Sequence, residues 1–280
     1  MADLPRYFSQ TAAGTYRQCP LRWKYRYIDK LPDPPGEPAL VGSFAHRVLE
    51  LLCDEPADAR TTDRARQLAK EVWPSTAAQG DFRSLDLDAE AELQFRWKAW
   101  SAIEALWQLE DPAQVTVRAT EQHVSTALDG VPFRGVIDRL DDADDGLVIT
   151  DYKSGRPPRQ DRRKEALAQV LLYTAAVEAD TGERPVRARL LFLGGDREIV
   201  ETRVDDEQLV ATTGALTATW EALGTDCAND SFEPTPGPLC GWCPYVDRCE
   251  PGANEVRRRA AANRLRDDAP ARRLLGISTD

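Results

Sequence analysis

The sequence contains no uninterrupted apolar run longer than a few residues in its 280 positions. A transmembrane helix needs about 20 consecutive, mainly apolar residues, so no such helix is expected. The first ten residues, MADLPRYFSQ, also lack the basic segment and the apolar segment of a secretory signal peptide. These absences predict a cytoplasmic protein that does not bind membranes.

Internal repeats, low-complexity tracts and the motif G-x-x-x-x-G-K-[S/T] are absent as well. Charged residues make up 30% of the chain and hydrophobic residues 42%, which is typical of globular domains and excludes disordered, collagen-like and coiled-coil chains. The missing phosphate-binding motif means that this sequence carries no helicase motif of that type.

Net charge is strongly acidic, with 36 Lys and Arg against 47 Asp and Glu, giving −11. This balance opposes nucleic-acid binding by the surface as a whole. Basic residues are nevertheless concentrated, with aromatic ones, in residues 6–30, and seven arginines lie within 257–273. Such segments can bind phosphates and stack on bases, or they can form solvated helix faces above packed aromatic side chains. In the first segment, the cations nearest Cys19 are Arg17, Arg22, Lys24 and Arg26.

Hydrophobic periodicity predicts helices and strands in a definite order. Four segments are expected to be helical: 41–53, 86–109, 163–180 and 205–223. Five are expected to be strands: 115–124, 131–140, 147–153, 187–194 and 197–204. Asp129-Gly130, between the first two strands, is a strong hairpin signal. The order predicts an α/β fold in which helices flank a mixed central sheet.

We therefore expect a single domain over 1–280. Its predicted parts are a helical N-terminal part (1–112), a core (113–225), and a C-terminal segment (226–280) that carries clustered cysteines and a helix.

Two carboxylates are expected at one edge of the sheet. One strand ends in Asp138, and the next runs into Asp151-Tyr152-Lys153. Neighbouring antiparallel strands can bring Asp138 and Asp151 together, and such a pair favours a hard divalent cation between them. Lys153 lies on the same face as Asp151, because side chains alternate along a strand. The alternative is an Asp–Lys pair on the surface of a hairpin, which contributes little.

Three further polar residues are candidates for the same site. Gln169 and Tyr173, spaced i and i+4, share one face of a predicted helix, although this is also ordinary helix-surface polarity. His46 occupies a polar position of the helix 42–53, where a lone histidine is more often packed than a ligand. Glu121, on the preceding strand, is either an additional site residue or part of a salt bridge.

The joint pattern GSFAH…RGVIDRLD…ITDYKSG…QVLLYTA resembles the RecB-type nuclease branch of the PD-(D/E)XK superfamily, which includes AddB-like and CRISPR-adaptation iron–sulfur nucleases. The resemblance implies a restriction-endonuclease-like fold. It also implies that Mg²⁺ or Mn²⁺ is bound by His46, Asp138 and Asp151. Lys153 would then be catalytic, and Gln169 and Tyr173 would contact DNA or support the site. Ile137 replaces the superfamily's proline, as is common in this branch.

Six cysteines occur, three of them within ten residues as Cys240-x₂-Cys243-x₅-Cys249. This spacing is a strong metal-ligand signal, and the missing signal peptide argues against disulfides. The family resemblance implies that Cys19 is the fourth ligand of a [4Fe–4S] cluster. A Cys₄ site for Zn²⁺ has the same ligand count and remains the alternative. Cys53 is expected to be a buried small hydrophobe, and Cys227 has no partner at a suitable spacing.

These features predict a metal-dependent deoxyribonuclease, an exonuclease acting on DNA ends or single strands in repair or recombination. Its expected partners are DNA and a helicase or repair protein. The alternative is a DNA-binding iron–sulfur or zinc module that does not cleave, acting as a subunit of a helicase-nuclease or repair complex.

Overall fold

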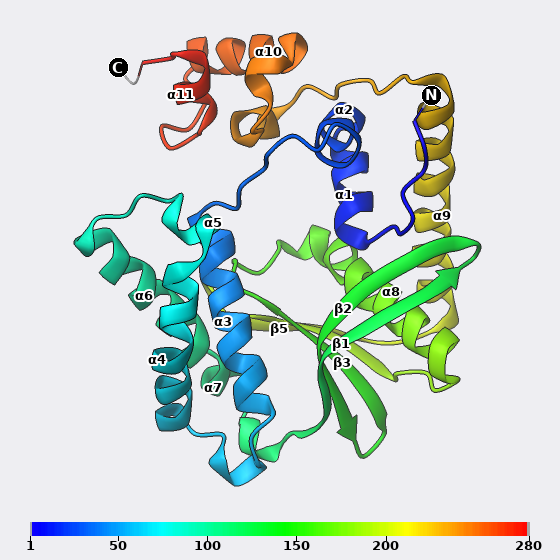
Figure 1. Cartoon of the computed structure of the whole chain (residues 1–280). Helices are drawn as coiled ribbons and strands as arrows, with labels where there is room; N and C mark the ends of the chain where they lie inside the picture. The colour runs from blue at the N-terminus through cyan, green and yellow to red at the C-terminus, as the bar shows by residue number, and fades with distance from the viewer. Residues whose placement is uncertain (1, 279–280) are drawn as a thin grey trace. The chain divides into compact units, whose positions relative to one another are not determined.

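The computed structural model describes residues 2–278 and divides into two compact units (Figure 1). We call Pro34–Gly214 the sheet unit. The cysteine unit consists of the described residues before Pro34 and after Gly214. The predicted single domain over 1–280 stays a prediction. No described helix is long and apolar enough to cross a membrane.

The sheet unit is built on five strands in the order β1-β2-β3-β4-β5. Their bounds are β1 (Thr116–Leu128), β2 (Val131–Ala143), β3 (Gly146–Lys153), β4 (Arg187–Phe192) and β5 (Glu198–Arg203). Pairing is antiparallel except between β3 and β4, so the predicted mixed sheet is confirmed. The β1–β2 turn places Asp129 and Gly130 at φ +47° and +83°, as the tight hairpin turn predicted from this dipeptide requires. Parallel β3 and β4 need a crossover, which α8 (Arg163–Thr181) supplies.

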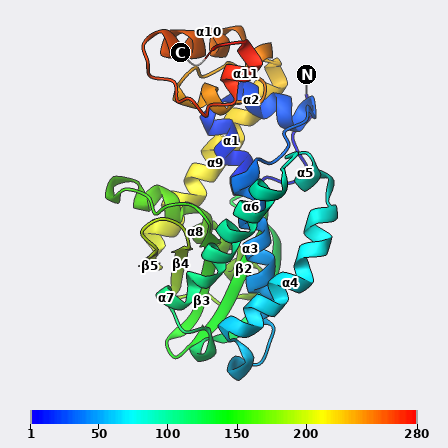
Figure 2. The ribbon, with the colours of Figure 1, turned by 90° about the vertical axis from the view of Figure 1, so that its left-hand side faces the viewer.

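A helical layer packs on one side of this sheet (Figure 2). Its long members are α3 (Glu37–Cys53), α4 (Thr62–Ala78) and α6 (Ala89–Glu104), with the short α5 (Gly80–Arg83) and α7 (Leu106–Leu109). Side chains cap two of the helices: Thr61 accepts a hydrogen bond from the N–H of Arg64, and Asp88 from that of Ala91. The sequence reasoning did not identify α4, and the segment 86–109 that it predicted as one helix is divided into α6 and α7.

The cysteine unit is helical. It contains α1 (Gln10–Gln18), α2 (Pro20–Trp23), a π-helical turn (Lys24–Ile28), the second part of α9 (Asp206–Asn229), α10 (Glu250–Ala261) and α11 (Ala271–Leu275). Trp23 is 1% exposed, and its ring stacks on Tyr27 and on Phe232 at centroid distances of 5.2 and 6.2 Å. Tyr16 is also buried and bonds Asp226 at 2.7 Å. These two aromatic side chains pack in the core and are not available to stack on bases.

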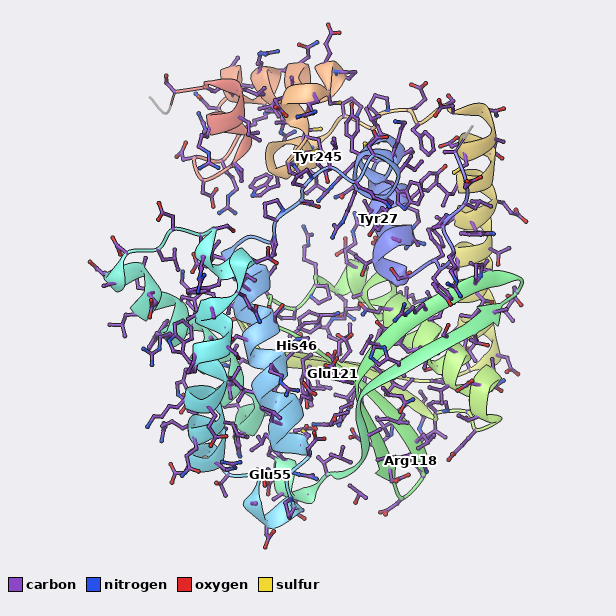
Figure 3. All side chains as sticks on the ribbon, in the orientation of Figure 1. Tyr27, His46, Glu55, Arg118, Glu121 and Tyr245 are labelled. Atoms are coloured by element: carbon purple, nitrogen blue, oxygen red, sulfur yellow. The ribbon has the colours of Figure 1, made fainter. Side chains whose placement is uncertain are left out.

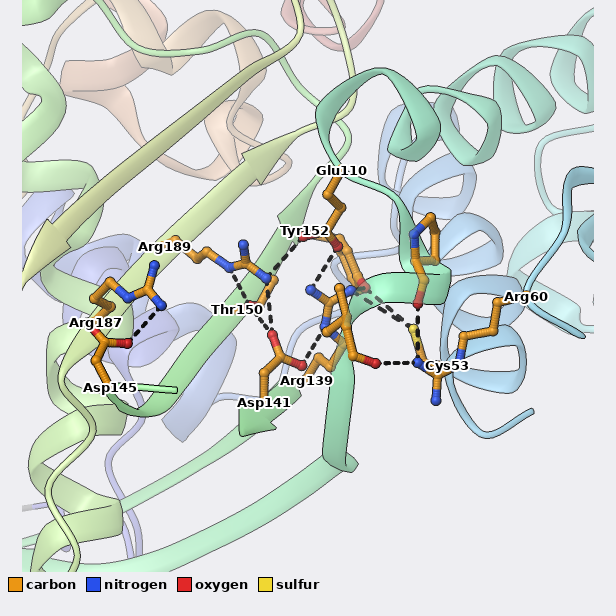
Figure 4. Close-up of polar contacts among 12 residues, drawn as sticks. Cys53, Arg60, Glu110, Arg139, Asp141, Asp145, Thr150, Tyr152, Arg187 and Arg189 are labelled. Atoms are coloured by element: carbon orange, nitrogen blue, oxygen red, sulfur yellow. Dashed lines mark hydrogen bonds and ion pairs between the residues drawn. The ribbon is translucent and has the colours of Figure 1, made fainter. Parts of the chain in front are cut away.

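A buried ion network lies under the sheet, on the face of β2 and β3 turned toward α3 (Figure 4). Arg139 is fully buried, and its guanidinium lies 2.8 Å from Asp141, 2.7 Å from Glu110 and 2.7 Å from the Tyr152 hydroxyl. Arg189 extends the network to the same two carboxylates at 2.9–3.0 Å. Within the described part of the chain, the ion pairs of these four charged side chains are all with one another.

Replacing Arg139 by Met should destabilise the sheet unit by about 3–5 kcal/mol, because Glu110 and Asp141 would lose a buried counter-charge that water cannot replace. Urea unfolding measures this change. Arg203→Met, which breaks an exposed ion pair with Asp145, is the control and should cost at most about 1 kcal/mol. Equal effects of the two substitutions would contradict the interpretation.

Candidate active site

The carboxylates of Asp138 and Asp151 meet where the pairing of β2 and β3 ends. The last paired residues are Arg139 and Thr150, so Asp138 and Asp151 lie one position beyond the pairing. Instead of continuing the ladder, the Asp138 carboxylate accepts a hydrogen bond from the backbone N–H of Tyr152 at 2.7 Å. Because side chains alternate along the strands, both aspartates face away from the Arg139 network. Asp138 and Asp151 thus lie together at the end of the β2–β3 pairing, where the sequence predicted the two carboxylates.

Lys153 and the two polar residues of α8 form one hydrogen-bonded chain with Asp151. Lys153 Nζ lies 2.7 Å from Asp151 Oδ2 and donates to Gln169 Oε1 at 2.9 Å. Gln169 Nε2 donates to Asp151 Oδ1 at 3.0 Å and to the Tyr173 hydroxyl at 2.8 Å. The amide orientation is determined, because its oxygen meets the ammonium and its nitrogen meets the carboxylate. Four residues predicted from two separate motifs therefore form one connected set of contacts.

A glycine makes room for Tyr173. A Cβ on Gly135 of β2 would overlap the Tyr173 ring, so the ring lies directly against the strand backbone. Gly42 acts similarly for α3: its Cβ would lie 2.8 Å from the Ser154 hydroxyl oxygen. Both glycines belong to the sequence motifs GSFAH and RGVID, and here they permit close approach of elements that carry site residues.

His46 approaches the aspartates from α3. Its Nδ1 lies 3.5 Å from Asp138 Oδ2, and its ring meets that of Tyr152 edge-on at 5.9 Å. Burial alone lowers the pKa of His46, but the bond to Asp138 and the charge of Asp151 outweigh it, so the net shift is upward. Among the described residues, His46 is thus a partner of Asp138 and not an isolated packed histidine.

Glu121 lies in the same region, near His46 (Figure 3). It has a left-handed backbone at φ +45° inside β1, between residues that pair with Arg139 and Ile137 of β2. No ion pair involves Glu121 within the described part of the chain, which disfavours the salt-bridge alternative. Burial, followed by the charges of Asp138 and Glu50, raises its pKa. Neither the strained backbone nor this electrostatic environment is visible in the sequence.

Negative charge in this site is only partly compensated. Burial, together with the charge of Asp138, raises the pKa of Asp151 to about 6, although Lys153 opposes the shift. Asp151 Oδ2 is buried, and the ammonium of Lys153 lies 2.7 Å from it. Two carboxylates and an imidazole are a donor set that suits Mg²⁺ or Mn²⁺. As the side chains stand, however, no three His, Cys, Asp or Glu residues within 2–278 are arranged to hold a metal ion.

The cysteine unit places all four predicted thiols along one cavity, although among the described residues no three of them, as the side chains stand, are arranged to hold a metal ion. Cys19, Cys240, Cys243 and Cys249 line one cavity of about 390 Å³. Backbone N–H groups donate to three of the sulfurs: Thr235 to Cys19, Gly237 to Cys240 and Gly252 to Cys249, at 3.4–3.5 Å. A Cβ on Gly252 would lie 3.2 and 3.6 Å from the sulfurs of Cys249 and Cys240, so this glycine leaves the thiols room. Thiols and N–H···S bonds fit an iron–sulfur cluster, and four thiols fit zinc equally. Cys53 and Cys227 are buried and do not line the cavity.

A model of the PD-(D/E)XK nuclease superfamily matches residues 7–250. The chain belongs to this superfamily. Gene 69 protein of Mycobacterium phage D29 is 24% identical over 266 residues, which cover 86% of this chain and 95% of the phage protein. A crystal structure from Eubacterium rectale, of a protein provisionally named an exonuclease, superimposes with a TM-score of 0.53 at 18% identity and covers 85% of this chain and 87% of that one. The mixed sheet with flanking helices is the restriction-endonuclease-like fold of the PD-(D/E)XK superfamily.

Three of the four N-terminal cations nearest Cys19 have acidic partners in this PD-(D/E)XK protein. Lys24 bonds Asp29 at 2.8 Å, and Arg26 lies 3.1 Å from Asp33, which is also 3.9 Å from Arg22. Asp33 falls just outside the segment 6–30 in which the basic residues are concentrated. A phosphate would have to compete with these carboxylates, so the N-terminal segment is a weaker candidate for DNA binding than the sequence suggested.

The raised pKa of Asp151 has a consequence for metal-free protein. The folded state keeps the Asp151 proton up to about pH 6, whereas the unfolded chain releases it near pH 4. Stability contributed by Asp151 is therefore lost as pH rises from about 4 to 6. Asp151→Asn should be more stable than the parent at pH 7, by roughly 1–3 kcal/mol, and this advantage should shrink at lower pH.

Urea unfolding in EDTA across this pH range measures the difference. Excess Mg²⁺ should stabilise the parent more than Asp151→Asn, because only the parent keeps both carboxylate ligands. Parallel pH profiles for the two proteins would contradict the assignment.

Proposed function

We propose that this chain is a divalent-metal-dependent deoxyribonuclease of the RecB-type branch. It would hydrolyse phosphodiester bonds as an exonuclease at DNA ends or on single strands, in repair or recombination. The observation that carries the proposal is the contact of Lys153 with Asp151 at the strand end that also presents Asp138. Unwinding would come from a helicase or repair partner.

Each site residue has a role in this proposal. His46, Asp138 and Asp151 would hold Mg²⁺ or Mn²⁺, which lowers the pKa of a bound water and neutralises charge on the phosphate. Lys153, released from Asp151, would orient the nucleophilic water or stabilise the developing negative charge. Gln169 would keep Lys153 and Asp151 in register, since it bonds both. Tyr173 fixes the Gln169 amide in turn.

We also propose that Cys19, Cys240, Cys243 and Cys249 hold a [4Fe–4S] cluster. Their common cavity and the N–H groups directed at three sulfurs support this assignment. Burial raises the pKa of the Cys243 and Cys249 thiols in the metal-free state, so binding would release protons. Metal bound here would link Cys19 to a segment more than 200 residues away, which restricts the unfolded chain and stabilises the unit.

The nuclease proposal predicts that Lys153→Met and Asp151→Ala each lower the turnover number by at least about 100-fold on single-stranded DNA with Mg²⁺. Each removes a group that acts on the reacting phosphate or its metal, and neither is needed to form the core. Lys70→Met, at an exposed position of α4, is the control and should cleave like the parent. Near-parental cleavage by Lys153→Met, or cleavage by the parent in EDTA, would reject the proposal. DNA binding without any cleavage by the parent would favour the non-catalytic module.

The cluster proposal predicts that Cys19→Ser loses as much iron as Cys243→Ser in protein purified without oxygen. Both proteins should also lose the broad visible absorbance of the cluster and unfold at lower urea concentration than the parent. Cys227→Ser, a buried thiol away from the cavity, is the control and should retain its iron. A full iron content in Cys19→Ser, or zinc in place of iron in the parent, would overturn the assignment.

A further inference from the structure

The segment that follows Lys153 is the most basic stretch of the sheet unit outside the site. Residues 154–164, SGRPPRQDRRK, contain five basic side chains against the single Asp161, in a chain whose net charge is −11. We call this segment the basic loop. It follows β3, which carries Asp151 and Lys153, and ends in the first two residues of α8, the helix that carries Gln169 and Tyr173.

Three cations of the basic loop are exposed and weakly compensated. Arg156 and Lys164 are exposed and make no ion pair among residues 2–278. Arg159 is 90% exposed, and its nearest carboxylate, that of Asp161, is 3.7 Å away. The other two basic residues have carboxylate partners: Arg162 pairs with Glu165 and Arg163 with Glu198.

The basic loop is anchored at both ends. A Cβ on Gly194 would overlap the Ser154 carbonyl oxygen, so the start of the loop packs directly on the β4–β5 turn. The aliphatic part of Arg156 lies on Gly195 of that turn, 2.6 Å from where its Cβ would be, which leaves the guanidinium exposed. Pro157-Pro158 restricts the backbone further on, and the pair of Arg163 with Glu198 holds the far end at 2.6 Å. Charges held in place bind a ligand without first being ordered.

Chain length limits how far these charges lie from the site. Arg156 lies three positions after Lys153, so their Cα atoms are at most about 11 Å apart. Phosphates along one strand of a duplex follow one another at about 3.4 Å per nucleotide along the axis. Arg156 therefore lies no more than a few phosphates along the strand from a phosphate bound at Lys153.

We infer that the basic loop binds the backbone phosphates of the DNA strand next to the scissile phosphate. This inference rests on the proposed nuclease function and adds a strand-binding surface to it. Arg156 and Arg159 contact phosphate, and Lys164 extends the contact. Recognition is of the phosphodiester backbone and carries no base specificity. Phosphate binding by the basic loop would also explain how a chain with a net charge of −11 binds a polyanion. The N-terminal cations that are paired with Asp29 and Asp33 would not be needed.

The test compares two double variants of equal charge. Arg156→Gln with Arg159→Gln removes two loop cations. Arg66→Gln with Arg203→Gln removes two exposed arginines from α4 and β5 of the same unit. Binding of a fluorescent oligothymidylate is measured in EDTA across a salt series, so no cleavage is needed. The loop variant should flatten the plot of log affinity against log salt by about 1.4, or 0.7 per lost phosphate contact, and the control variant should match the parent.

Kinetics provide the second measurement. With Mg²⁺, the loop variant should raise KM while its turnover number at saturating DNA stays within about twofold of the parent, because the residues that touch the reacting phosphate are intact. Identical salt slopes for the two double variants would overturn the inference. A fall in turnover number with an unchanged slope would also overturn it, since the loop would then only support Lys153.

Two safeguards keep the test decisive. Because Arg156 packs on Gly195, a second loop variant, Arg159→Gln with Lys164→Gln, removes two charges without disturbing that contact, and it should flatten the slope equally. If the parent binds DNA but never cleaves it, the nuclease proposal fails, and the salt slopes still decide whether the loop binds phosphate.

Discussion

The site depends on the point at which β2 and β3 stop pairing. There the carboxylate of Asp138, and not a strand carbonyl, accepts the N–H of Tyr152, while the Tyr152 ring and hydroxyl are held from below by Arg139. Asp151 and Lys153, the two neighbours of Tyr152 in the chain, lie on the opposite face of the sheet, where the site is. The buried ion network around Arg139 on one face of the sheet thus fixes the backbone. That backbone presents the candidate site on the other face, where the charges are only partly compensated. Binding of a metal ion and a phosphate there needs both a rigid backbone, held by the network, and uncompensated negative charge in the site.

Much of this arrangement could be predicted from the sequence because its signals are local. Alternation located the strands, Asp129-Gly130 located the hairpin, and the spacing between Asp151 and Lys153 placed them on one face. Gln169 was expected near the site from its helix position and from the family resemblance, but its contacts with both of those residues were not predicted. The sequence of α8 does not itself indicate which strand the helix will contact.

The missed features depend on contacts between distant segments. Helix α4 is the exception, because its buried residues Ala65, Leu68 and Val72 recur at helical spacing and its local signal was overlooked, although Pro74 lies inside it. Glu121 has a conformation that its position in β1 imposes. Asp33 neutralises cations up to eleven positions earlier, so a count of charge within a window misjudged the N-terminal segment. Tertiary partners, and not local composition, decide which charges remain free.

The order of the units along the chain affects how the molecule is made. Cys19 is synthesised early, but Cys240, Cys243 and Cys249 come only after the whole of Pro34–Gly214. During translation the sheet unit can therefore emerge and fold while the cysteine unit still lacks three of its four thiols. A chain truncated after Gly214 would retain every proposed catalytic residue and have no complete thiol set. Incorporation of the proposed cluster would then distinguish full-length chains from truncated ones, which would retain the proposed ligands of the divalent ion.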